Sequence, residues 1–200
     1  MEKIYRPLII ISSLFIGLNA FIVYGFLGLG VAVHPVIKAN FKAHPIGIYF
    51  HIFPSLIALL LGPFQFNKKF RITKTHLHKL IGKVYLLCVL IGSISGLYMA
   101  QFSFGGTISH LGFALLAVLW IFTGYKAYTS IIRKMIVAHY NWMVINFALT
   151  FAAVTLRIGV GFGSGIPFEI FYPYLAWICW TPNLLIALFI IRKDAAHLTH

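Results

Sequence analysis

The sequence predicts an all-α, polytopic membrane protein, and three observations carry that prediction. Of the 200 residues, 60% are hydrophobic and only 10% are charged, whereas about a quarter of the residues in a soluble domain are charged. The mean hydropathy is +0.93. The apolar residues are gathered into six stretches, each near or above the roughly 20 residues that a helix needs to cross the hydrocarbon core.

These stretches predict a bundle of six transmembrane helices that forms a single membrane domain over residues 1–200. The expected spans cover approximately residues 8–33, 46–66, 79–102, 108–131, 140–160 and 170–191. The first stretch is too long for a signal-peptide core, and no small-residue cleavage site follows it, so we expect it to be retained. Cys88 and Cys179 lie inside spans without a CxxCH context, which argues against covalently attached haem.

The positions of the lysines and arginines predict the orientation, because positively charged loops resist translocation. One side of the membrane would hold only Lys38 and Lys42. The other side would hold Lys3, Arg6, Lys68, Lys69, Arg71, Lys74, Lys79, Lys83, Lys126, Arg133, Lys134, Arg192 and Lys193. Both termini are therefore expected in the cytoplasm. This topology explains the net charge of +13 without any nucleic-acid partner, and it implies attraction to anionic lipid headgroups.

Four histidines open four successive spans: His51, His78, His110 and His139. Successive spans cross in opposite directions, so His51 and His110 would share the outer face of the membrane and His78 and His139 the inner face. Two imidazoles at one depth can take both axial positions of a haem iron. Ionisable groups within membrane spans are candidates for function. The layout thus predicts haem b, one or two per chain, with these histidines as iron ligands.

Helical phase indicates which way the histidines point. Asn146, Thr150 and Arg157 follow His139 at 7, 11 and 18 residues, which places them on its face of a continuous helix. Arg157 would then lie near the outer surface, where it would pair with a haem propionate or an anionic substrate. Small or polar residues share the faces of the other histidines, namely Ser55, Gly62 and Gln65 with His51, Gly82, Tyr85, Gly92 and Gly96 with His78, and Ala114, Ala117, Gly124 and Tyr128 with His110.

Each of these features has a simpler explanation beside the functional one. A histidine near a membrane surface often makes an interfacial hydrogen bond or extends to the headgroups. A glycine such as Gly82 or Gly92 often serves close helix packing. In the functional interpretation, Ser55, Gly82 and Ala114 leave room for a planar macrocycle one turn from its ligand.

Several motifs resemble the bacterial membrane family called domain of unknown function 2306. They include Gly62-Pro63-Phe64-Gln65-Phe66, Leu77-His78-Lys79-Leu80-Ile81-Gly82 and Ala138-His139-Tyr140-Asn141-Trp142. The residues of this chain that fit the family pattern are His51, Gln65, Arg71, His78, Gly82, Tyr85, His139, Trp142 and Arg157. His110 is outside the pattern. The resemblance implies a bacterial plasma membrane protein, and it implies no particular chemistry.

The layout is also similar to that of the transmembrane cytochrome b-561 family, which carries electrons through two bis-histidine haems. That similarity implies pairs of His51 with His110 and of His78 with His139, and a transmembrane oxidoreductase. A quinol or an anionic cytoplasmic donor would reduce the inner haem. Arg71, Lys79 and Lys83 would bind that donor or the inner propionates.

Two other functions remain open at the level of sequence. A haem-free transporter, or a protein that binds a small molecule or metal ion, would use the polar stripe as a pathway, although the sequence shows neither an inverted repeat nor paired broken helices. A non-catalytic assembly subunit would use the glycine faces only for packing.

Overall fold

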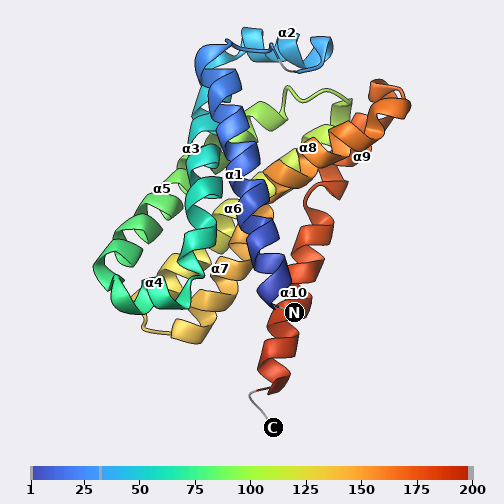
Figure 1. The fold of residues 1–200 in the computed structure, drawn as a ribbon. Coiled ribbons are helices and arrows are strands. Elements are labelled where there is room, and N and C mark those ends of the chain that lie inside the picture. Colours follow the sequence, from blue (N-terminus) through green and yellow to red (C-terminus); the bar gives the residue numbers. More distant parts are fainter. Residues whose placement is uncertain (1, 32, 198–200) are drawn as a thin grey trace. The chain divides into compact units, whose positions relative to one another are not determined.

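The computed structural model describes residues 2–31 and 33–197, and the side chains of residues 7–31, 33–163 and 165–193. Within these ranges the chain is helical and contains no strand. The elements in order are α1 (Glu2–Phe26), α2 (Pro35–Ala43), α3 (Pro45–Gln65), α4 (Lys68–Thr73), α5 (Thr75–Ala100), α6 (Gly106–Ile132), α7 (Ile136–Thr150), α8 (Ala152–Phe162), the 3-10 turn η1 (Gly163–Gly165), α9 (Phe168–Ile178) and α10 (Thr181–His197) (Figure 1).

Six helical segments of the described chain are long and apolar enough to cross a membrane, which confirms the expected fold class. They are Pro7–Phe26, Pro45–Gln65, Thr75–Ala100, Gly106–Ile132, Ile136–Phe162 and Phe168–Lys193. The first ends seven residues before the expected boundary. Gly28 and Gly30 follow it with φ of +84°, a conformation that glycine adopts at no steric cost, so the chain turns there although its residues remain apolar.

The chain divides into two compact units, Met1–Phe104 and Gly105–His200, and each is described by itself. The expectation of one membrane domain stays a prediction. In unit 1, α3 and α5 form the central pair and α1 packs against α3. The pair is antiparallel, because His51 near the start of α3 contacts Gly92 late in α5, while Gln65 at the end of α3 lies beside Gly82 early in α5.

Glycines let the helices of unit 1 approach closely. A Cβ atom at Gly47 of α3 would lie 2.7 Å from the ring of Tyr98 on α5, and one at Gly17 of α1 would lie 2.5 Å from Leu60 on α3. Gly92 and Gly96, which form a GxxxG pair, are both buried. The glycine face expected beside His78 is thus a packing surface for α3.

In unit 2, α6 pairs with α7, α9 packs against α6, and α10 packs against α7. The α6/α7 pair is also antiparallel, because His139 early in α7 contacts Ala127 late in α6. The turn between them follows an αL residue, Lys134, with φ of 59°. The amide of Lys134 donates to Ile131 and the amide of Met135 donates to Ser130, which is the Schellman pattern of a helix end.

The fifth and sixth spans each consist of two consecutive helices, α7 with α8 and α9 with α10. Phe151 and Cys179, at the two junctions, keep right-handed helical φ and ψ, so neither span contains an unwound segment there. In the fifth, the Thr155 hydroxyl donates to the Phe151 carbonyl, and such bonds bend helices. In the sixth, Pro182 has no amide hydrogen to continue the helical ladder. No proline or glycine lies at the first junction, so the order of residues does not predict it.

Candidate functional site

His51 lies in the second turn of α3, half-buried, with its Nδ1 atom 2.8 Å from the carbonyl oxygen of Gly92 on α5. A carbonyl oxygen can only accept, so Nδ1 carries the hydrogen of this bond. In the neutral imidazole the lone pair is then on Nε2. The neighbouring helix thereby fixes both the tautomer and the orientation of the ring.

His139 lies in the first turn of α7 and makes the same contact in unit 2. Its Nδ1 atom is 2.9 Å from the carbonyl oxygen of Ala127 on α6. The ring is half-buried, and again the lone pair of the neutral form is on Nε2. Metal-bound histidines commonly use their second nitrogen in this way, to donate to a carbonyl that holds the ring in place.

His78 lies in the first turn of α5, half-buried, with Phe70 of α4 edge-on to its ring at 6.4 Å between centroids. Gly82 follows one turn later on the same face. A Cβ at Gly82 would lie 3.2 Å from the side-chain oxygen of Gln65, so the space beside this glycine is bordered by the Gln65 amide. A role for Gly82 beside a cofactor stays a prediction.

His110 lies in the first two turns of α6 and is half-buried. The α6 residues that bond to α7 are Trp120, Thr123 and Ala127. At 100° per residue, these lie roughly 80° to 140° around the helix from His110. His110 therefore does not share the face of α6 that bonds to α7.

Within each unit, the two histidines predicted as iron ligands lie at opposite ends of an antiparallel helix pair. His51 contacts Gly92, which follows His78 by 14 residues, or roughly 21 Å along α5. His139 contacts Ala127, which follows His110 by 17 residues, or roughly 25 Å along α6. Two histidines of one unit are thus too far apart to ligate one iron, in agreement with their predicted alternation in depth.

Polar residues on the inner face of α7 form a closed hydrogen-bonded network with α6. The amide of Asn146, which is 0% exposed, donates to the Trp120 carbonyl at 2.8 Å and to the Thr123 hydroxyl at 2.8 Å. The Trp120 indole donates to the Thr150 hydroxyl at 2.9 Å. The expected inward direction of Asn146 and Thr150 is confirmed.

Unit 1 contains a buried amide that differs from this network. Gln65 at the end of α3 is 6% exposed, and its Nε2 atom has no hydrogen-bond partner among the described residues. A buried donor without a partner carries a cost of about 1–3 kcal/mol. Gln65 is therefore a polar group of α3 that an additional acceptor would stabilise.

The two predicted arginines lie outside these networks. Arg157 is half-buried on α8, where its guanidinium donates to the Ala153 carbonyl at 2.9 Å. Its alignment with His139 on one helix face stays a prediction. Arg71 is half-buried on α4, the short helix that precedes α5. Both roles toward a cofactor or donor stay predictions.

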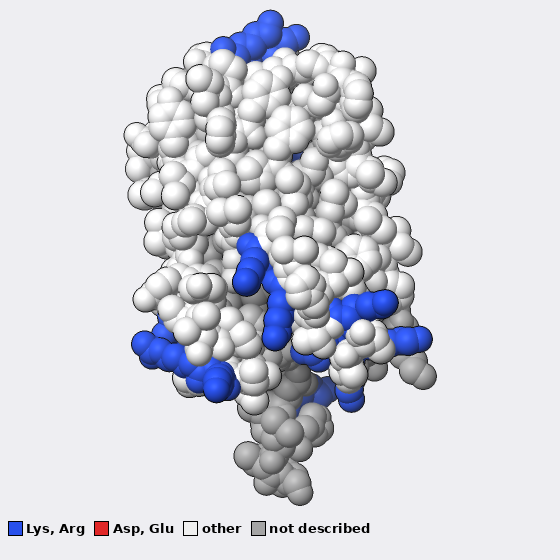
Figure 2. All heavy atoms as spheres, turned by 90° about the vertical axis from the view of Figure 1, so that its left-hand side faces the viewer, with Lys and Arg blue, Asp and Glu red and all other residues white. Residues whose placement is uncertain are grey.

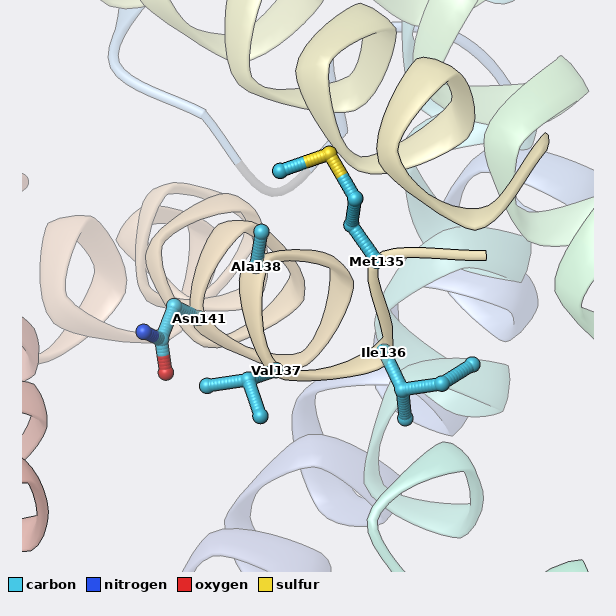
Figure 3. A pocket seen from close by; sticks show the side chains of 5 residues that line it. All are labelled: Met135, Ile136, Val137, Ala138 and Asn141. Atoms are coloured by element: carbon cyan, nitrogen blue, oxygen red, sulfur yellow. The ribbon is translucent and has the colours of Figure 1, made fainter. Parts of the chain in front are cut away.

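A shallow hollow of about 400 Å³ lies at the start of α7, lined by Met135, Ile136, Val137, Ala138 and Asn141 (Figure 3). Ala138 and Asn141 belong to a motif that resembles the family, whereas nothing in the sequence marks Met135, Ile136 and Val137, because exposed apolar side chains are common near a membrane. No titratable side chain lines the hollow, so it offers no acid or base. A second feature missed from the sequence is Lys126, whose ammonium lies 5.5 Å from the centre of the Trp142 ring.

Six apolar spans, with inward polar groups supplied by paired helices, define a polytopic α-helical membrane protein. The chain belongs to the family of predicted membrane proteins designated DUF2306, whose model matches residues 48–191. The resemblance read from the motifs is confirmed. Comparisons with curated proteins and with solved structures give no significant match.

Proposed function

We propose that this protein is a b-type cytochrome that carries electrons within or across the membrane by means of histidine-ligated haem. The observation that carries the proposal is the orientation of His51 and His139, whose Nδ1 atoms each donate to a carbonyl of a neighbouring helix. This bond leaves the lone pair of the neutral ring on Nε2, the nitrogen with which histidine commonly binds haem iron.

His51 and His139 are the ligands best supported by geometry, and His78 and His110 are the other two proposed. Bound haem would accept and release single electrons, while the chain would supply ligation, burial and electrostatics. A quinol or an anionic donor would deliver electrons near His78, where Arg71 and neighbouring lysines supply positive charge. The pairs inferred from layout, His51 with His110 and His78 with His139, stay predictions.

The test is the visible absorption spectrum of the purified full-length protein, oxidised and then reduced with dithionite, with haem quantified per chain. We expect a Soret band, and a loss of haem in His51→Ala and in His139→Ala. His76→Ala is the matched control, because His76 is exposed on the same turn of α5 as His78. Absence of a Soret band after expression with ample haem would refute the proposal.

The same spectra test the pairing. If two histidines ligate one iron, a double replacement within a pair removes no more haem than either single replacement. Replacements from different pairs would remove haem additively. Retention of haem in His110→Ala, with loss in His139→Ala, would select a single haem site.

We also propose a bacterial plasma membrane location with both termini in the cytoplasm. The support is the distribution of basic residues, with Lys38 and Lys42 on α2 and a larger group on α4 and the first turns of α5. Single cysteines placed at exposed Lys42 and Lys69, in a variant without Cys88 and Cys179, would be labelled by an impermeant maleimide in intact cells. Labelling of position 42 alone agrees with this orientation, and labelling of position 69 alone reverses it.

A hydrogen bond between the fifth and sixth spans favours a second candidate, a haem-free transporter. Asn183 at the start of α10 donates to the Thr155 hydroxyl of α8 at 2.7 Å, so polar groups of these two spans lie side by side. Polar groups inside membrane spans often line transport pathways. Proton flux into proteoliposomes, abolished in Asn183→Leu but present without haem, would favour this candidate over the cytochrome.

A further inference from the structure

Two lysines on α5 face outward without any carboxylate nearby in the sequence. Lys79 and Lys83 are one helical turn apart, so they share a face, and both are exposed. Glu2 is the only acidic residue of unit 1, and no Asp or Glu occurs between it and Glu169. Residues 3–104 therefore contain nothing that can neutralise these two ammonium groups.

The same face of α5 continues as an exposed aliphatic stripe. Leu87, Leu90, Ile94 and Leu97 lie within about 40° of Lys83 around the helix. Their exposed fractions are 56%, 43%, 58% and 42%. From Leu87 to Leu97 the stripe extends roughly 15 Å along the axis, which is half of the roughly 30 Å hydrocarbon core.

Figure 2 looks onto the side of the molecule where α5 lies in Figure 1. All charged atoms visible in this view belong to lysine or arginine. More basic residues of unit 1 lie at the α4 end of α5, namely Lys68, Lys69 and Lys74, all exposed. The positive field is thus strongest where the aliphatic stripe begins.

We propose that this face of α5 binds an acidic phospholipid. Its phosphate lies between Lys79 and Lys83, and one acyl chain lies along Leu87, Leu90, Ile94 and Leu97. Lysines extend their aliphatic stems along apolar surface and place the ammonium group at headgroup level. A phospholipid contacts the lysines through its phosphate and the aliphatic stripe through its acyl chain, whereas a soluble anion contacts only the lysines.

A second basic pair of unit 1 provides a control. Lys38 and Lys42 are also one turn apart, on α2. That helix is only 9 residues long, and Lys38 is half-buried with its stem against Gly30. Too few residues follow Lys42 on α2 for an acyl chain to lie along it. A general attraction of lipid to basic residues would involve both pairs, and a lipid site on α5 involves only Lys79 and Lys83.

The experiment is native mass spectrometry of the full-length protein in detergent, with added phosphatidylglycerol or phosphatidylcholine. We expect one phosphatidylglycerol to be retained in preference to phosphatidylcholine. Each lysine contributes about fivefold to such binding, so the Lys79→Gln/Lys83→Gln variant should bind about 25-fold more weakly. Lys38→Gln/Lys42→Gln should bind as the parent does, and Lys79→Arg/Lys83→Arg should keep the preference.

Three results would overturn the proposal. Equal retention of the two lipids would show that the headgroup is not recognised. Equal losses in the two glutamine variants would assign the effect to net charge. Displacement of the lipid by millimolar inorganic phosphate would assign the lysines to a soluble anion. None of these outcomes depends on haem, so the lipid site and the cytochrome proposal fail separately.

Discussion

The α3/α5 pair of unit 1 and the α6/α7 pair of unit 2 are both antiparallel, and in each a histidine donates to a carbonyl of the partner helix. They differ in how the rest of the interface is made. The first pair packs through glycines, and no described residue bonds to the amide nitrogen of Gln65. The second pair holds Asn146 in a closed network with Trp120, Thr123 and Thr150.

This difference separates polar groups that stabilise the protein from those available for binding. Asn146 uses both hydrogens of its amide within unit 2, so its role is accounted for by packing. Gln65 is also buried, yet its amide nitrogen has no partner among the described residues, and native proteins usually have a reason for such a group. The contrast points to the end of the α3/α5 pair near His78 as the region to examine for a ligand.

The largest expected effect is that of Asn146→Leu, a replacement of similar size. It removes two buried hydrogen bonds, each worth about 0.6–1.7 kcal/mol between membrane helices, so we expect a loss of about 2 kcal/mol. Gln65→Met, the counterpart in unit 1, removes an unsatisfied donor and should be neutral or stabilising. Unfolding by sodium dodecyl sulfate, followed by circular dichroism, measures both. Equal losses of unfolding free energy in the two variants would show that the two helix pairs do not differ in this way.

Gly112→Ala should be next, at about 1.5 kcal/mol, from crowding in a packed interface. Its new Cβ would lie 2.9 Å from the Trp177 indole nitrogen and 3.0 Å from the Ala176 carbonyl oxygen, and backbone cannot move aside easily. The matched change in unit 1, Gly82→Ala, meets only the end of the Gln65 side chain and should cost little. The thermal midpoint in detergent compares the two variants, and a larger loss at Gly82 would contradict this reasoning.

Trp120→Phe isolates one bond of the closed network. The indole hydrogen bond to Thr150 is lost while the aromatic ring remains, so we expect a loss of about 1 kcal/mol. Thr150→Val removes the same bond from the other side. In a double-mutant cycle on the same unfolding assay, the two effects should not add. Additive effects would show that the bond contributes nothing to stability.

The smallest expected change in stability concerns the segments that connect the two helices of each pair. Unit 1 joins α3 to α5 through α4, whose first turn is capped by Asn67, whereas unit 2 uses a tight turn with Lys134 in the αL conformation. Lys134→Gly should stabilise the protein by about 0.5 kcal/mol, because glycine adopts positive φ without strain. Lys134→Ala keeps the strain and serves as the control. Equal thermal midpoints for the two variants would contradict the strain that we assign to the positive φ of residue 134.

Much of the fold was predictable because crossing a membrane depends on local composition. The six spans and the histidines at their starts follow from the order of apolar and polar residues, and helical phase placed Asn146 and Thr150 inward. The junction at Phe151 was not predictable, because no proline or glycine lies there.

The sequence by itself determined the class of the protein, the number of its spans and the residues on their inner faces, because hydropathy and helical periodicity are properties of neighbouring residues. Only the tertiary structure decided which carbonyl orients His51 and His139, that Gln65 lies beside Gly82, and that Asn146 is satisfied. Each of these depends on atoms about 3 Å apart that belong to residues 12 to 41 positions apart in the chain. Helix packing sets such distances, and composition does not encode them.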